Sequence, residues 1–199
     1  MWDGVVVSGN SNQSQGTSYA SIPHQGFVSM NDATISNARN GITTGESDAN
    51  NNFIWSTTGG VIVAHNSDFI NNHRDIQYLH YVNPLFPNMN AGKFTDCRFL
   101  TNSKLNEGKP NVHVSLQNVF NVKFQGCEFS YNAGTAYPQE EHGYGIFSND
   151  AVYSVTDFGS QQTTFNNLFS GICVKNFNPL RTVNVDHAIF NDAYNGTQS

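Results

Sequence analysis

The residues that could do chemistry gather in three insertions between short apolar segments, at residues 77–92, 100–111 and 130–145. They carry aromatic rings, carboxylates and imidazoles at the following positions: Tyr78, His80, Tyr81, Phe86, Tyr137, Glu140, Glu141, His142 and Tyr144. Aromatic faces stack on sugar rings, and carboxylates and imidazoles accept hydroxyl protons, so this set is typical of a saccharide-binding groove. The alternative is that the aromatics only hold their own loops against the body of the protein.

Catalysis would demand a stricter arrangement than binding. A glycosidase needs two carboxylates about 5–5.5 Å or about 6.5–9.5 Å apart. Glu140 and Glu141 are adjacent in sequence and can diverge in direction, so a partner carboxylate from elsewhere would be required. The enzymatic alternative is a polysaccharide lyase or glycoside hydrolase that uses Glu140, Glu141 and His142 as catalytic residues between the loops.

Three charged residues share one position of the repeat described below. Asp68, Arg98 and Glu128 each come directly before a repeated phenylalanine. Stacked in successive coils, they would form an acid–base–acid ladder. Such a ladder is either a catalytic trio or a solvated set of cross-strand ion pairs worth a few tenths of a kcal/mol, and the second interpretation is favoured.

The cysteines and histidines show no metal-binding pattern, because the Cys and His spacing of zinc sites is missing. No metal and no other cofactor is predicted. Cys97 and Cys127 share one inward position of the repeat, and we expect them to be neighbours but reduced. Parallel strands should hold their Cβ atoms slightly too far apart for a disulfide. The histidines, among them His65 and His113, are expected to be ordinary polar surface residues.

A repeated phenylalanine must position all of these groups. The stretch KFTDCRF at residues 93–99 returns as KFQGCEF at residues 123–129. Its second Phe, called the anchor here, recurs along the chain, with Ile in its place once: Ile35, Phe69, Phe99, Phe129, Phe165 and Phe190. A small residue precedes each anchor by two positions. Asn or Asp often follows by two positions, and Gly often follows by six, with Asp75 in one repeat.

Small-x-Phe is the alternation of a strand with one buried face, and Asn and Gly mark turns with positive φ. Anchors 25 to 36 residues apart, with no helical periodicity between them, indicate a solenoid. We therefore predict an all-β fold, a parallel β-helix of about six coils whose anchors stack about 4.8 Å apart in the core. The alternative is a β-sandwich, but the hairpin turns that it needs every 8–12 residues or so are scarce.

All three insertions follow the anchor of their coil. In a solenoid such insertions emerge along the same side, so we expect them on one flank, as the walls of a groove.

The segments ISNARNGI at residues 35–42 and FNNLFSGI at residues 165–172 resemble the right-handed parallel β-helix repeat of pectate-lyase-like proteins. WDGVVV, QGFVSMNDATISNARNGI and GGVIVAHNSDFINN are similar to β-helix modules of large secreted surface proteins, notably from Bacteroidetes. The resemblance covers nearly the whole chain and implies a right-handed coil in a bacterial protein that is secreted or held at the cell surface. β-Helices host lyases, hydrolases, adhesins and stalks, so function must be argued from the site. The polygalacturonase motifs and the calcium cluster of pectate lyases are not evident.

The composition limits the kinds of partner that the protein is expected to bind. Aromatic residues make up 13% of the chain, which favours a folded protein. A net charge of −6 without a basic stripe argues against nucleic acid, and no apolar run reaches the roughly 20 residues of a membrane span. The chain starts and stops in strand-like sequence without an export signal. We therefore expect residues 1–199 to form one domain, with adjoining coils or domains in a longer secreted protein.

The favoured hypothesis is a non-catalytic extracellular module that serves as a surface scaffold or glycan-binding face. Its expected partner is a polysaccharide, bound on the flank that carries the insertions.

Overall fold

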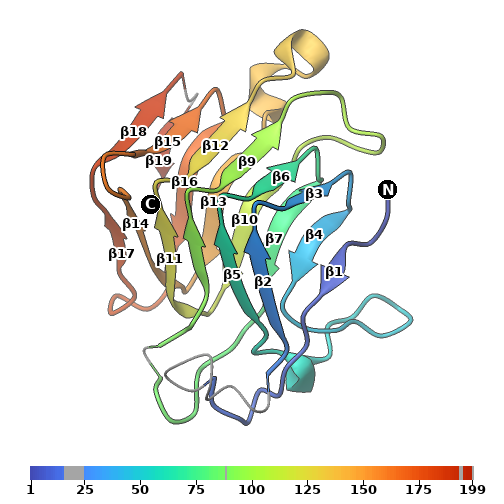
Figure 1. The fold of residues 1–199 in the computed structure, drawn as a ribbon, viewed down its shortest axis with the longest axis vertical. Helices are drawn as coiled ribbons and strands as arrows, with labels where there is room; N and C mark the ends of the chain where they lie inside the picture. Colours follow the sequence, from blue (N-terminus) through green and yellow to red (C-terminus); the bar gives the residue numbers. More distant parts are fainter. Residues whose placement is uncertain (16–24, 88, 193–194, 199) are drawn as a thin grey trace.

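The computed structural model describes residues 1–15, 25–87, 89–192 and 195–198. In this part of the chain, three parallel sheets wind into one column (Figure 1). We call them sheets I, II and III, and each coil passes through sheet II, then sheet III, then sheet I. The three connections are corners II–III, III–I and I–II. The predicted right-handed parallel β-helix of about six coils is confirmed.

The described strands divide among the sheets as follows. Sheet I holds β1 (Val5–Val6), β4 (Asn40–Thr43), β7 (Arg74–Tyr78), β10 (Val112–Gln117), β13 (Tyr144–Asn149), β16 (Ser170–Lys175) and β19 (Asn195–Gln198). Sheet II holds β2 (Phe27–Asn31), β5 (Val61–His65), β8 (Lys93–Thr95), β11 (Phe120–Gln125), β14 (Val152–Thr156) and β17 (Val183–Val185). Sheet III holds β3 (Thr34–Ser36), β6 (Asp68–Ile70), β9 (Arg98–Thr101), β12 (Glu128–Tyr131), β15 (Thr163–Asn166) and β18 (Ala188–Asn191).

The anchor residues form one stack on the inner face of sheet III. They pair in register from coil to coil, in this order: Ile35, Phe69, Phe99, Phe129, Phe165 and Phe190. Successive phenyl rings lie 4.6 to 4.9 Å apart with planes tilted by only 5 to 6°. The four inner phenylalanines are fully buried, while Phe190 is half-buried. The anchor stack is confirmed.

A second, shorter stack faces the anchors from sheet II. Phe94 and Phe124, the first aromatics of the two quoted motifs, lie 5.1 Å apart and nearly parallel. Their edges meet the anchor rings, with Phe94 5.7 Å from Phe99 and Phe124 6.0 Å from Phe129. Stacked contacts along the column and edge contacts across it are the two arrangements that aromatic quadrupoles prefer.

Asn and Asp side chains make the turns at two corners. At corner III–I, Asn37, Asn71 and Asn167 have φ between 54 and 58°. At corner II–III, Asp32 and Asn66 have φ of 52 and 45°. These short polar residues tolerate the left-handed region because they can bond locally, and glycine is not needed at such positions.

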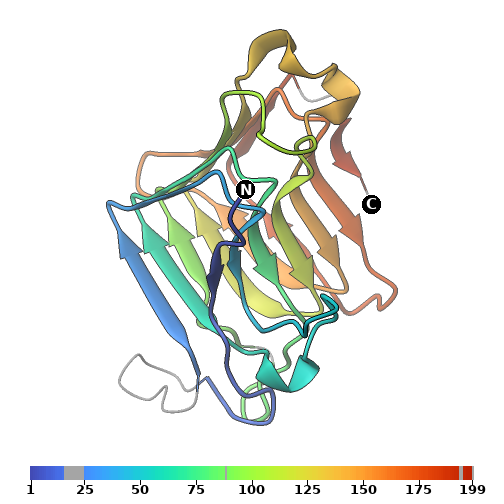
Figure 2. The same cartoon turned by 90° about the vertical axis from the view of Figure 1, so that its right-hand side faces the viewer.

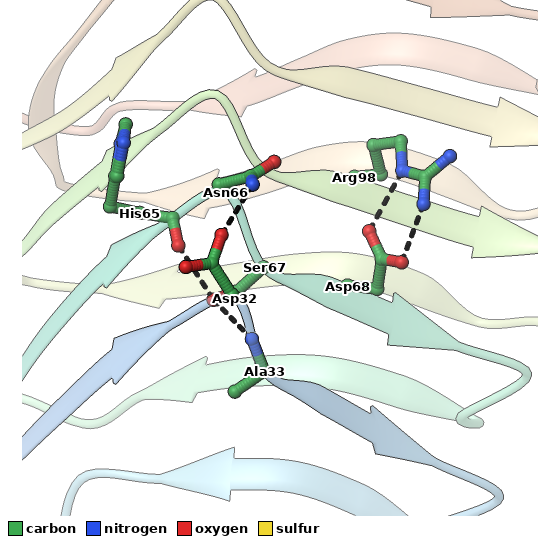
Figure 3. A network of polar contacts seen from close by, with 7 residues as sticks. All are labelled: Asp32, Ala33, His65, Asn66, Ser67, Asp68 and Arg98. Atoms are coloured by element: carbon green, nitrogen blue, oxygen red, sulfur yellow. Dashed lines mark hydrogen bonds and ion pairs between the residues drawn. The ribbon is translucent and has the colours of Figure 1, made fainter.

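Figure 3 shows how corner II–III is tied from one coil to the next. The Asn66 side chain donates to the Asp32 carboxylate at 2.5 Å. The Ser67 hydroxyl donates to the His65 carbonyl at 2.8 Å and accepts the Ala33 amide at 3.3 Å. The Ser67 hydroxyl therefore satisfies a backbone amide of the preceding coil and a carbonyl of its own turn.

The charged ladder lies next to this corner on the outer face of sheet III. Arg98 donates through Nε and Nη2 to both oxygens of Asp68, at 2.8 and 2.6 Å (Figure 3). Glu128 is the register partner of Arg98 on the following coil. The Arg98 side chain is 55% exposed, so Asp68 and Arg98 form a solvated ion pair, as favoured from the sequence, with Glu128 beside it in register.

The cysteines occupy adjacent coils, since the Glu128 amide donates to the Cys97 carbonyl at 2.9 Å. Cys97, Cys127 and Cys173 are all free and buried. The expectation of reduced neighbours therefore agrees with the structure.

The insertions do not share one flank. Residues 79–92 connect sheet I to sheet II, at corner I–II, whereas residues 102–111 and 132–143 connect sheet III to sheet I. Figures 1 and 2 show the two groups at opposite ends of the strands. The single-flank prediction is wrong for the first insertion, because the chain crosses sheet I as β7 before that insertion begins.

Candidate functional site

Two clefts border the column at different corners. The carboxylate cleft lies at corner III–I and has a volume of about 470 Å³. The side chains that matter to its chemistry come from four successive coils: His73, Lys109, Glu140, Glu141, Tyr144 and Phe169. Insertions 102–111 and 132–143 supply its charged walls, so two of the three predicted loops do form a groove.

An ion pair joins the two walls of the carboxylate cleft. Lys109 Nζ lies 3.1 Å from Glu141 Oε1. His73 donates through Nδ1 to the Lys109 carbonyl oxygen at 2.7 Å, which leaves Nε2 with the lone pair. Burial, and then the nearby charges of Arg74 and Arg39, lower the pKa of His73, although its bond to the Lys109 carbonyl opposes them. The imidazole is therefore neutral near pH 7.

Tyr144 supplies the aromatic surface of this cleft and is half-buried. Its ring meets Phe169 at 5.4 Å and Phe147 at 5.6 Å, both edge-on. These contacts hold the ring in place, which reduces the entropy that a bound ligand would have to remove.

Tyr137 and His142 are structural residues of the same insertion. Tyr137 is 9% exposed, and its hydroxyl donates to the Gly108 carbonyl at 2.9 Å and accepts the Leu105 amide at 3.1 Å. His142 stacks on Tyr131 at 3.6 Å, and its two ring nitrogens face the carbonyls of Asn167 and Tyr137. Since carbonyl oxygens occupy both nitrogens, His142 has none left to act as a base on a ligand.

A buried Asp–His pair lies inside the coil at the same levels. His113 Nδ1 lies 2.6 Å from Asp75 Oδ2, and Asn72 donates to Asp75 Oδ1 at 2.8 Å. The side chains of His113 and Asp75 are 6% and 1% exposed. Burial raises the pKa of Asp75, while His113 and Asn72 oppose that shift. The prediction of a surface histidine is therefore wrong for His113, and it is also wrong for His142.

The tryptophan cleft lies at corner I–II and has a volume of about 430 Å³. Its lining combines one indole, one imidazole and several amides: Trp55, His80, Gln117, Asn118, Asn149 and Asp150. Trp55 opens η2 (Trp55–Thr57), a short 3-10 turn in the connection 44–60. Of the predicted ligand-binding residues, His80 is the one that this cleft uses.

The remaining predicted aromatics lie apart from both clefts. Tyr78 is 1% exposed and meets Phe94 edge-on at 6.4 Å inside the coil. Tyr81 is 2% exposed and donates its hydroxyl to the Gln13 carbonyl at 2.8 Å, and burial raises its pKa to about 12. Phe86 is 37% exposed but lines neither cleft. For Tyr78, Tyr81 and Tyr137, the loop-anchoring alternative describes the structure better than the binding hypothesis.

Sequence reasoning missed Trp55, His73 and Lys109. Trp55 lies in a connection without a motif, and His73 follows an anchor by four residues within an ordinary turn. Lys109 stands in the second predicted insertion, and its basic charge opposite Glu140 and Glu141 was the available signal. Whether such residues meet depends on the distance between them across a corner of the column, and the number of residues that separates them along the chain does not reveal this distance.

The chain matches no protein-family model, no curated protein and no solved structure. The fold assignment therefore rests on the sheet topology and register. Within the described residues, no group of three or more His, Cys, Asp or Glu side chains could hold a metal ion. None of the helices in the same part of the chain is long and apolar enough to cross a membrane.

Proposed function

We propose that this β-helix is a non-catalytic binding and scaffolding module of a secreted or surface protein, with polysaccharide as its ligand at the carboxylate cleft. The observation that carries the proposal is the meeting of Tyr144, Glu140 and Glu141 in one cleft walled by two insertions. A held aromatic ring can stack on a sugar, and carboxylates beside it can accept hydroxyl protons. The resemblance to pectate-lyase-like modules of Bacteroidetes surface proteins supports the extracellular location in this proposal.

Several features favour binding over turnover. Glu141 is already paired with Lys109, and both ring nitrogens of His142 face carbonyl oxygens. A glycosidase would need one carboxylate kept as an acid and a second as a base or nucleophile. The chemistry left in the cleft is one further carboxylate, Glu140, and the neutral imidazole of His73.

The test is binding of a panel of neutral, acidic and amino oligosaccharides, measured by calorimetry. We expect millimolar to micromolar binding of at least one member, weakened about tenfold or more by Tyr144→Ala. Phe86→Ala is the matched control, because Phe86 is a partly exposed aromatic that does not line the cleft. Equal losses in the two variants, or binding unaffected by Tyr144→Ala, would remove this cleft as the glycan site.

A hydrolase or lyase at the same cleft is the second candidate, because Glu140, Glu141 and His73 face one space. Release of reducing ends or of unsaturated sugars from the same panel would reveal it. Turnover that disappears in Glu140→Gln, while Phe86→Ala remains active, would replace the binding proposal with the enzymatic one.

A further inference from the structure

We propose that the tryptophan cleft is a second, independent ligand site and that it takes a neutral sugar ring. The site faces corner I–II, away from the carboxylate cleft at corner III–I. Insertions and strands of several coils build it: Trp55 comes from residues 44–60, His80 from residues 79–92, and the amides from the ends of β10 and β13.

The indole offers a fixed stacking surface. Trp55 is 48% exposed, and its ring is met edge-on by Phe53 at 5.7 Å and by His80 at 6.5 Å. The turn beneath it is closed by Thr57, whose hydroxyl donates to the Ile54 carbonyl at 2.7 Å, and by Thr58, whose hydroxyl donates to the Trp55 carbonyl at 3.0 Å. An exposed indole held in this way stacks with little loss of side-chain entropy.

Two buried amide oxygens of residues that line the cleft lack partners, although Asn118 Nδ2 lies 2.6 Å from His80 Nδ1. Seven buried side-chain polar atoms in the described residues have no hydrogen bond, and two of them, Asn118 Oδ1 and Asn149 Oδ1, belong to residues that line the cleft. Two more, Asn176 Oδ1 and Arg181 Nη1, belong to the connection 176–182. Native proteins leave few buried polar atoms unsatisfied, so this group marks the wall of the cleft as a place where small side-chain movements can offer further acceptors to a bound molecule.

The connection 176–182 borders the cleft at Asp150. Asp150 Oδ1 accepts the backbone amides of Phe177 and Asn178, at 2.8 and 3.1 Å. Arg181 lies over the Phe120 ring at 3.7 Å. The guanidinium is thus engaged with an aromatic face, and neither Lys nor Arg is among the residues that line the cleft.

Charge selects among sugars. Burial, followed by the charge of Arg181, lowers the pKa of His80, so its imidazole is neutral near pH 7. Asp150 is the carboxylate of the lining. A uronate or sulfate would bring a second negative charge beside Asp150, and Arg181, the nearby cation, lies over the Phe120 ring outside the lining. The hydroxyls of a neutral sugar can instead donate to Asp150 and to the Gln117 amide oxygen.

The chain provides its own control for the test. It has two tryptophans, and Trp2 is 47% exposed, almost the same as Trp55. Trp2 donates through Nε1 to the Ser36 carbonyl at 2.8 Å and does not line the cleft. Neutral gluco-, manno- and galacto-oligosaccharides and a uronate oligosaccharide are titrated against the full chain by calorimetry and tryptophan fluorescence.

We expect a neutral oligosaccharide to bind and to change the fluorescence of Trp55. Trp55→Ala should weaken this binding at least tenfold and Gln117→Ala severalfold, while Trp2→Ala leaves it unchanged. Absence of neutral-sugar binding, tighter binding of the uronate, or equal losses in Trp2→Ala and Trp55→Ala would overturn the inference. Loss in Tyr144→Ala alone would place the sugar in the carboxylate cleft, so failure here is distinguishable from failure of the proposed function.

Discussion

The inner faces of sheet III and sheet I bury different chemistry at the same levels of the column. Sheet III repeats one apolar ring from coil to coil. Sheet I carries Gly41, Asp75, His113, Gly145 and Gly171 at one register position. This position faces the anchor stack, since a Cβ at Gly145 would lie 2.7 Å from the Phe165 ring and the His113 ring lies 6.3 Å from Phe129.

The difference shows two ways to fill a solenoid. Each anchor ring contacts identical rings above and below, so the stack can be extended by any number of coils. The Asp75–His113 pair occupies two coils where the repeat otherwise has glycine, and each side chain depends on the other as a specific partner. A buried polar pair loses hydration, and only good hydrogen-bond geometry compensates for that loss, so the pair confers little net stability, but breaking it is costly.

Breaking the stack should produce the largest effect. Phe129→Ala removes a fully buried ring that is sandwiched between Phe99 and Phe165. We expect the free energy of unfolding, measured by urea denaturation, to fall by about 3–5 kcal/mol. Phe190→Ala, at the half-buried end of the stack, should cost clearly less. Similar losses in the two variants would show that stacking within the column does not govern stability.

The Asp75–His113 pair should show strong coupling at a smaller cost. In a double-mutant cycle of Asp75→Asn and His113→Gln, we expect each single change to cost about 1–3 kcal/mol, because each leaves a buried group poorly paired. The coupling energy should lie at about 0.5–3 kcal/mol, because the two side chains share one hydrogen bond. Additive losses in the cycle would contradict a specific pair.

Asp75→Asn also tests the direction in which the pKa of Asp75 is shifted. The pKa of Asp75 is raised in the folded protein, so its stabilising contribution is present at low pH and is lost as the pH rises through the folded-state value. Asp75→Asn cannot ionise, so its free energy of unfolding relative to wild type should improve as the pH rises above about 4. A relative loss for Asp75→Asn over that range would mean that the carboxylate is stabilised in its charged form.

The outer ladder should give the smallest effect. Arg98→Ala removes the two bonds to Asp68 on a solvated face, and we expect a loss of about 0–1 kcal/mol that shrinks in high salt. Thermal unfolding at low and high salt measures it. A loss comparable with that of Phe129→Ala would show that this ladder stabilises the column as strongly as the anchor stack does.

The sequence by itself determined the column. Each coil must cover the apolar face of the next, so the same residue returns at the same angular position, and this requirement is visible as the anchor spacing and the Asn turns. It also placed Cys97 beside Cys127 and Asp68 beside Arg98, because register pairs follow directly from the repeat.

Only the tertiary structure decided what lies at the corners. The repeat does not encode how far past the anchor an insertion leaves the chain, so residues 79–92 emerge at a different corner from residues 132–143. Tyr81 contacts Gln13 and His113 contacts Asp75, and both of these partners lie more than thirty residues away along the chain. Tyr78 is buried because its position in β7 points inward. The two clefts arise for the same reason: Trp55 meets His80, and Lys109 meets Glu141, because coils bring together residues that spacing along the chain keeps apart.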